Sequence, residues 1–142
     1  MTQVSIREFQ YPADYAAAVR LWESSGAGIR VGASDTPEEI EKKLQRDPDL
    51  FLVAESGGEM IGTVIGGFDG RRGTVYHLAV AAAHRRRGVA SQLMQELERR
   101  LRGKGCIRAY LVVRPDNIDA MQYYETIGWG QLDDYLFAKN LT

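Results

Sequence analysis

Residues 84–94, HRRRGVASQLM, place three consecutive arginines in front of the start of a predicted helix. The first amides of a helix have no partner within the helix and lie at the positive end of its dipole, where a phosphate binds readily. Gly88 allows the backbone to approach a ligand without a Cβ in the way, and Ala90 is the smallest alternative to a second glycine. The side chains of Arg85 to Arg87 add positive charge at the mouth of this loop. The segment therefore predicts a site for a small phosphate-bearing anion.

A second set of polar and small residues lies further along the chain, in the tract Asn117–Trp129, NIDAMQYYETIGW. Its spacing, NxxAxxxYExxGW, coincides with a predicted helix over Ile118–Ile127 that Asp116 or Asn117 would cap. The tract contains two neighbouring tyrosines, Tyr123 and Tyr124, and a tyrosine hydroxyl can donate a proton. Periodicity does not by itself choose Tyr124, because a second tyrosine shares its apolar stripe.

The common nucleotide-binding loops, GxxxxGK[ST] and GxGxxG, are absent from the sequence. The two tracts instead resemble motifs of the GCN5-related N-acetyltransferase (GNAT) superfamily, RxxGxG/A after a strand ending in LAV, and NxxAxxxYExxGF. The matching residues are Leu78-Ala79-Val80, Arg85, Gly88, Ala90 and the tract Asn117–Trp129. Three further segments look closest to small YpeA-like bacterial acetyltransferases: LFLVAE, GTVIGGFDGRRG and VVRPDN.

The resemblance implies acetyl-CoA as cosubstrate, bound between two strands that splay apart, here Thr74–Val80 and Ile107–Val113. Backbone groups of Leu78 and Val80 would pair with the pantetheine arm, to which Asn117 would add a polar contact. The pyrophosphate would be received by the amides of Arg86 through Ser91. The residues expected at the cosubstrate are Leu78, Ala79, Val80, Arg85, Arg86, Arg87, Gly88, Val89, Ala90, Ser91, Asn117 and Tyr124.

The reaction implied by the resemblance is direct attack of a neutral primary amine on the acetyl thioester in a ternary complex. The amine must lose a proton, and the departing thiolate must gain one. Tyr124 matches the tyrosine that serves the family as general acid, with a purely structural role as the alternative. Carboxylates that serve some relatives as the base are replaced by Thr74 and Val112, which leaves His77, or a water acting through backbone carbonyls. Strand alternation also allows His77 to face away from the cleft as a structural histidine.

The acceptor amine is expected between the first two helices, the Gly66–Gly70 region and the loop leading to the last strand. Its identity cannot be deduced from the sequence. Acidic side chains that could attract an amine there, or that are simply scattered surface acids, are Glu23, Asp35, Asp69, Asp133 and Asp134. The two tryptophans, Trp22 and Trp129, are expected in the core.

Periodicity and turn signals predict the elements that must position these residues. The expected order is a strand at Ser5–Phe9, helices at Tyr15–Trp22 and Pro37–Arg46, strands at Leu50–Glu55, Met60–Phe68 and Thr74–Val80, a helix at Gly88–Arg102, a strand at Ile107–Val113, a helix at Ile118–Ile127 and a strand at Leu132–Lys139. This order, β-α-α-β-β-β-α-β-α-β, predicts an α+β domain with four helices and a mixed, mostly antiparallel sheet of about six strands. It is also the order of the GNAT superfamily.

The composition fits one domain over residues 1–142, since 44% of the residues are hydrophobic and the chain is too short for two cores. The net charge of -1 is unevenly distributed, because residues 71–108 carry 10 Lys and Arg against 2 Asp and Glu, between acidic flanks. This pattern favours one localised anion site over general nucleic-acid binding. RNA or ribosome binding through the arginines is kept as an alternative.

The N-terminal sequence, the hydropathy and the cysteine count indicate the expected location and partners of the protein. The N-terminus lacks the basic-then-apolar pattern of a signal peptide and no apolar run is long enough to span a membrane, so a cytoplasmic protein without a membrane partner is expected. Cys106 is the only cysteine, and no zinc-type Cys/His spacing occurs, so we expect neither a disulfide nor a metal. A monomer and a homodimer both remain open. The main alternative to an acyl-CoA-dependent N-acyltransferase is a CoA-binding regulatory or sensing module that has lost turnover.

Overall fold

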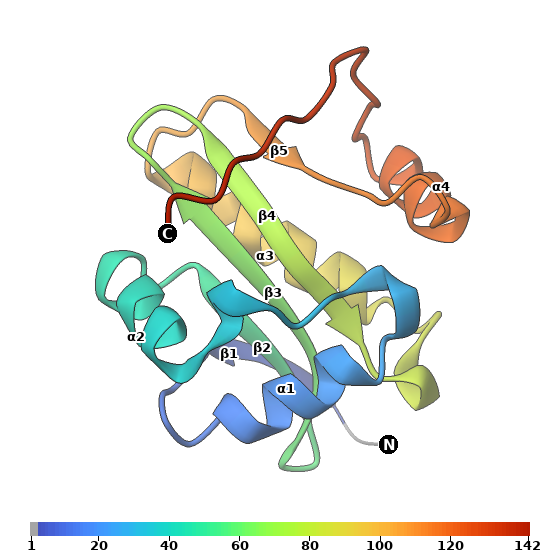
Figure 1. Ribbon diagram of the computed structural model, residues 1–142. Helices are drawn as coiled ribbons and strands as arrows, with labels where there is room; N and C mark the ends of the chain where they lie inside the picture. Colours follow the sequence, from blue (N-terminus) through green and yellow to red (C-terminus); the bar gives the residue numbers. More distant parts are fainter. Residues whose placement is uncertain (1–2) are drawn as a thin grey trace.

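The computed structural model of the chain describes residues 3–142 and forms one open, mixed sheet flanked by helices (Figure 1). The five strands lie side by side in chain order; the pairs β1–β2, β2–β3 and β3–β4 are antiparallel, and β4 and β5 are parallel. Their bounds are Val4–Glu8 for β1, Phe51–Ser56 for β2, Glu59–Phe68 for β3, Gly73–Val80 for β4 and Ala109–Leu111 for β5.

Four α-helices and three short 3-10 helices complete the domain over residues 3–142. Helices α1 and α2 lie over one face of the sheet and α3 lies over the other, while α4 stands beyond the end of β5 (Figure 1). The α-helices span Tyr15–Glu23 (α1), Pro37–Arg46 (α2), Val89–Gly103 (α3) and Ile118–Thr126 (α4). The 3-10 helices span Gly26–Gly28 (η1), Ala33–Asp35 (η2) and Ala82–His84 (η3). The predicted α+β class and the four predicted helices are thus confirmed.

The start of α2 shows how local signals fix a helix. The Thr36 side chain accepts a hydrogen bond from the Glu39 amide at 3.3 Å, and Pro37 occupies the first helical position. The helix ends at Arg46, just before Asp47-Pro48, as the sequence predicts.

Each face of the sheet carries its own hydrophobic layer. The layer under α3 contains the apolar face of that helix, including Leu93 and Leu97, whereas the layer under α1 is built around Trp22 and Phe51. Trp22 is completely buried, which confirms the expected core role of this residue. Gly66 of β3 lets α3 pack closely, because a Cβ there would collide with the Leu97 side chain.

The prediction of a last strand at Leu132–Lys139 is wrong. Residues 131–142 are exposed throughout and form no strand, so the sheet in the described part of the chain has five strands instead of about six. The strand expected at Ile107–Val113 is also shorter, since only Ala109–Leu111 pairs with β4. A strand needs a hydrogen-bonding partner as well as a suitable sequence, and β5 offers three residues only.

None of the helices within residues 3–142 is both long and apolar enough to cross a bilayer. The cytoplasmic location stays a prediction.

Candidate active site

Strands β4 and β5 stay paired for only three residues and then separate (Figure 1). The pairs are Gly73 with Ala109, Thr74 with Tyr110 and Val75 with Leu111. Beyond this point β4 continues to Val80 without a sheet partner on its β5 side. The backbone of residues 76–80 therefore presents a strand edge without a neighbouring strand, although the Val80 carbonyl accepts a hydrogen bond from Arg85. The sequence places Leu78, Ala79 and Val80 at the pantetheine here.

A bulge interrupts the middle of β4. Ile65 of β3 pairs with Tyr76, but Thr63 pairs with Ala79, so two residues of β4, His77 and Leu78, stand opposite one residue of β3. His77 adopts a φ of 50°, which is rare for a residue with a side chain. A bulge of this kind shifts the inward and outward alternation of a strand.

The faces of the neighbouring residues show this shift. Val75 packs in the layer under α3 and Ala79 in the layer under α1, although residues four apart in a regular strand share a face. The side chain of Ala79 is buried in that layer, so this residue can offer a ligand little more than its backbone.

His77 is held on the α1 side of the sheet. Its Nε2 lies 2.9 Å from Oδ1 of Asp35, and its ring meets the Trp22 ring edge-on with 4.7 Å between centroids. The Thr63 hydroxyl connects His77 to Trp22. It donates to the His77 carbonyl at 3.0 Å and accepts from the Trp22 indole at 2.9 Å. Strand alternation alone could not have placed this ring, because the bulge decides its face.

The loop between β4 and α3 contains a run of free backbone amides. Within residues 3–142, no amide from Arg86 to Ser91 donates a hydrogen bond, and the first helical bond runs from the Gln92 amide to the Gly88 carbonyl. Arg86 and Gly88 both have positive φ angles, 63° and 80°. Such a curved run of amides is a concave anion-binding surface. It comprises the residues expected at the pyrophosphate: Arg86, Arg87, Gly88, Val89, Ala90 and Ser91.

The space next to these amides is open and positively charged. A Cβ built on Gly88 would meet no atom within 4 Å. The side chains of Arg86 and Arg87 are exposed, and neither forms an ion pair with a carboxylate in the described part of the chain. Arg85 instead donates from Nε to the Val80 carbonyl at 3.0 Å, which ties the loop to the end of β4.

Asn117 caps α4 next to the loop that follows α1. Its Oδ1 accepts a hydrogen bond from the Ala120 amide at 3.2 Å, so of the two predicted caps Asn117 is the one used. Its Nδ2 lies 3.3 Å from the position that a Cβ on Gly28 would take. The amide nitrogen of Asn117 is therefore the part of this side chain that can reach a ligand.

The two tyrosines of α4 have different surroundings. The Tyr124 ring lies against those of Trp129 and Tyr123, with centroid distances of 6.2 and 5.6 Å. Burial, with a contribution from Tyr123, raises the pKa of Tyr124 to about 12. The Tyr123 hydroxyl lies 3.0 Å from Oγ of Ser91 and so connects α4 to the first turn of α3. Sequence reasoning missed this contact, because no spacing rule links a helix to a residue on another helix.

The predicted acceptor region contains a cavity of about 510 Å³ near Gly67 and Asp69. Its lining carries three cationic side chains, those of Lys43, Arg46 and Arg72. The Asp69 carboxylate is occupied by the amides of Arg71 and Arg72, each at 2.8 Å. Among the other acids considered for this side, Glu23, Asp133 and Asp134 are exposed, and Asp35 is bound to His77.

Comparisons with known proteins agree with this geometry. The sequence model of the acetyltransferase (GNAT) family matches residues 15–129. An acetyltransferase of Pectobacterium atrosepticum is 41% identical over 128 residues, which cover 90% of this chain and 89% of its own. Ard1 from Thermoplasma volcanium superposes with a TM-score of 0.77 at 27% identity, over 88% of this chain and 81% of that one. The PaiA N-acetyltransferase from Thermoplasma acidophilum, solved in complex with coenzyme A, shares the fold, with a TM-score of 0.81 at 18% identity over 94% and 93% of the two chains.

Proposed function

The chain belongs to the acetyltransferase (GNAT) family, and from this premise we propose that it moves an acetyl group from acetyl-CoA to a primary amine within a ternary complex. The observation that carries the proposal is the run of six free amides from Arg86 to Ser91, which follows directly on the free edge of β4. A pyrophosphate needs several donors and compensating positive charge, and this loop supplies both.

The pyrophosphate and the pantetheine arm of acetyl-CoA each have a group of residues to hold them. The pyrophosphate is received by the amides behind Arg86 and Arg87, and the absence of a side chain at Gly88 lets it approach them. The pantetheine arm pairs with the free backbone edge of Leu78 to Val80, as an added strand would. Asn117, whose Oδ1 is already used as the cap of α4, offers its amide nitrogen to this arm.

Tyr124 is the general acid in this proposal. The amine nitrogen attacks the thioester carbonyl carbon, the bond between that carbon and sulfur breaks, and the thiolate takes the proton of the Tyr124 hydroxyl. The nitrogen gives up a proton as it becomes the amide nitrogen, and the Tyr124 phenolate takes up a proton from solvent, which restores the hydroxyl. The raised pKa of Tyr124 supports the role, because the hydroxyl stays protonated until the thiolate forms beside it. Tyr123 is the better candidate for packing and for the contact to Ser91.

Calorimetric titration with acetyl-CoA, followed by thiol release with a panel of amines, tests the proposal. The panel should contain small metabolites, polyamines, aminoglycosides and peptides with free N-termini. We expect binding of acetyl-CoA and turnover with at least one amine. Binding without turnover for any amine would favour the regulatory module instead, and absence of binding would contradict both.

The role of Tyr124 as general acid is tested by replacing each of the two neighbouring tyrosines with phenylalanine. Tyr124→Phe should lower kcat at least about tenfold and leave the affinity for acetyl-CoA nearly unchanged, since an acid acts mainly in the transition state. Tyr123→Phe, the matched control, should retain most of kcat. Equal kcat values for the two variants would contradict the role of Tyr124 as general acid.

A further inference from the structure

Asp35 is a buried residue whose carboxylate contacts one histidine. Only 4% of the residue is exposed. Its Oδ2 accepts the Gly32 amide at 3.0 Å, and its carbonyl oxygen accepts the Tyr15 hydroxyl at 2.6 Å. Within residues 3–142, the basic side chain that reaches this carboxylate is that of His77, at 2.9 Å. A buried carboxylate of this kind needs a hydrogen-bonding or cationic partner, and here that partner is a titratable ring.

The contact with Asp35 determines which ring nitrogen of His77 is free. Because Nε2 faces a carboxylate, we assign the proton of the neutral ring to Nε2, and the lone pair is then on Nδ1. Nδ1 accepts no hydrogen bond from the described part of the chain. It is also not sealed from solvent, because it is not among the buried polar atoms without a partner and the side chain is 18% exposed.

His77, which carries this free nitrogen, lies in the bulge of β4, the strand that is proposed to hold the thioester arm. His77 directly precedes Leu78, the first of the residues expected at the pantetheine arm, and its positive φ turns the ring toward Asp35. A regular strand would have put the ring on the α3 side, away from α1 and η2. The combination of a strained residue, a buried carboxylate and an unoccupied ring nitrogen is more than the packing of a structural histidine requires.

We propose that Asp35 is a positioning residue that holds His77 as the general base of the acetyl transfer, an inference that rests on the proposed function. The carboxylate of Asp35 fixes the tautomer and orientation of the ring. Nδ1 of His77 takes one proton from the ammonium form of the acceptor, and the neutral amine then attacks the thioester carbon. The imidazolium that forms is stabilised by Asp35 and returns its proton to solvent after the product leaves.

The groups that surround the ring are few. Besides Asp35 on η2, the elements packed around His77 carry the Trp22 and Tyr15 side chains of α1 and the Thr63 hydroxyl of β3. Burial first, then the carboxylates of Asp35 and Glu38, raise the pKa of Tyr15, so this hydroxyl stays neutral near pH 7. Asp35 is thus the charged group in direct contact with the ring.

The first test needs no acceptor. Two-bond proton–nitrogen correlation spectra of ¹⁵N-histidine protein, recorded with saturating acetyl-CoA, report the tautomer of each histidine. We expect His77 protonated on Nε2, with Asp35→Asn weakening this preference. A His77 ring protonated on Nδ1 would overturn the proposal.

The second test uses kinetics with the panel amine that turns over fastest. Asp35→Asn and His77→Gln should each lower kcat by about 100-fold, the usual contribution of a general base. The double variant should be no slower than His77→Gln, because Asp35 acts through His77. Additive losses, or an unchanged kcat in Asp35→Asn, would overturn the proposal.

A second buried carboxylate separates the positioning of His77 from general destabilisation. The matched control is Asp14→Asn, which removes another buried carboxylate, the one bound by Arg7, from the same layer of the protein. It should reduce stability and leave both the tautomer of His77 and kcat in place. An equal loss of kcat in Asp14→Asn and Asp35→Asn would contradict the proposal.

Calorimetry keeps this proposal distinct from the proposed function. Asp35→Asn should bind acetyl-CoA within about twofold of wild type, because the contacts of Asp35 are with Tyr15, Gly32 and His77 and not with the amides of residues 86–91. Failure of the wild-type protein to bind acetyl-CoA would contradict the proposed function. Intact binding with an unaffected kcat in Asp35→Asn would contradict the positioning role alone.

Discussion

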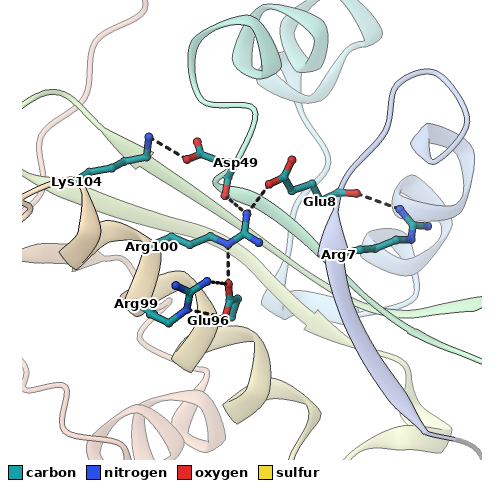
Figure 2. A network of polar contacts seen from close by, with 7 residues as sticks. All are labelled: Arg7, Glu8, Asp49, Glu96, Arg99, Arg100 and Lys104. Carbon is teal, nitrogen blue, oxygen red and sulfur yellow. Dashed lines mark hydrogen bonds and ion pairs between the residues drawn. The ribbon is translucent and has the colours of Figure 1, made fainter.

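The two ends of helix α3 both carry arginine clusters, and the two clusters behave in opposite ways. At the C-terminal end, Arg100 contacts Glu96 and Glu8 and the backbone carbonyl of Asp49, while Arg99 shares Glu96 (Figure 2). At the N-terminal end, the exposed side chains of residues 85–87 form no ion pair with a carboxylate in the described part of the chain.

The difference separates a structural use of arginine from a ligand-binding one. The C-terminal cluster connects α3 to β1 through Glu8 and to the segment before β2 through Asp49 (Figure 2). Its charges are compensated, so little of their field is available to a ligand. The N-terminal cluster leaves its charge and six backbone amides uncompensated, which is the condition for binding a phosphate.

The largest expected effect comes from filling the N-terminal site. Gly88→Trp should reduce the affinity for acetyl-CoA by at least about 100-fold, because it puts a bulky side chain into the open space beside the amides and strains a φ of 80°. Calorimetry measures the loss. Gly105→Trp is the matched control, since Gly105 lies just beyond the other end of α3, also has a positive φ and also faces open space. Comparable losses of acetyl-CoA affinity in both variants would contradict the assignment of the phosphate site to the N-terminal end of α3.

Removing the uncompensated charges should have the next largest effect. Arg86→Ala combined with Arg87→Ala should weaken acetyl-CoA binding by about tenfold at low salt, and by less as salt screens the wild-type attraction. Titrations at two salt concentrations test this expectation. Arg99→Ala should leave the affinity unchanged, and a weakening equal to that of the double variant would contradict the division of roles.

The C-terminal cluster should respond in stability instead of binding. Arg100→Ala should lower the free energy of unfolding by about 1–2 kcal/mol, because it leaves Glu96 and Glu8 without a partly buried partner. Chemical denaturation measures this change. Arg99→Ala, which removes an exposed arginine bound to the same Glu96, should cost less than about 0.5 kcal/mol. Equal costs would mean that burial does not distinguish the two arginines.

The smallest expected effect is the pH dependence of the same cluster. Hydrogen bonds from Arg99 and Arg100 lower the pKa of Glu96 to about 2 in the folded protein. Because the folded pKa is depressed, the stabilisation is complete above the unfolded pKa of about 4.3 and is lost as the pH falls toward 2. The stability difference between wild type and Glu96→Gln should therefore shrink from pH 6 to pH 3. A constant difference over this range would contradict the pairing.

Local signals allowed much of the fold and the phosphate loop to be predicted from the sequence. The cap at Thr36 and the loop around Gly88 depend on neighbouring residues, and the structure has α2 and the loop where the sequence predicts them. The face of His77 depends on the register between β3 and β4, which no local pattern reveals. The failed strand at Leu132–Lys139 has the same cause, since its sequence favours a strand but a strand forms only beside a partner.

The contact between Asp35 and His77 also joins residues far apart in the sequence. The sequence suggested Asp35 as one of several acids near an acceptor and His77 as one of two possible bases. Their pairing follows from the bulge in β4 and from the short helix η2, neither of which periodicity predicts.

The most direct test of where acetyl-CoA binds is an amide proton–nitrogen NMR titration of the intact protein. Addition of acetyl-CoA should cause the largest shifts at the amides of residues 86–91, which lie at the proposed pyrophosphate site, and small shifts at residues 99–104. Largest shifts at residues 99–104, or none at residues 86–91 upon saturation, would contradict the assignment of the cosubstrate site to the N-terminal end of α3.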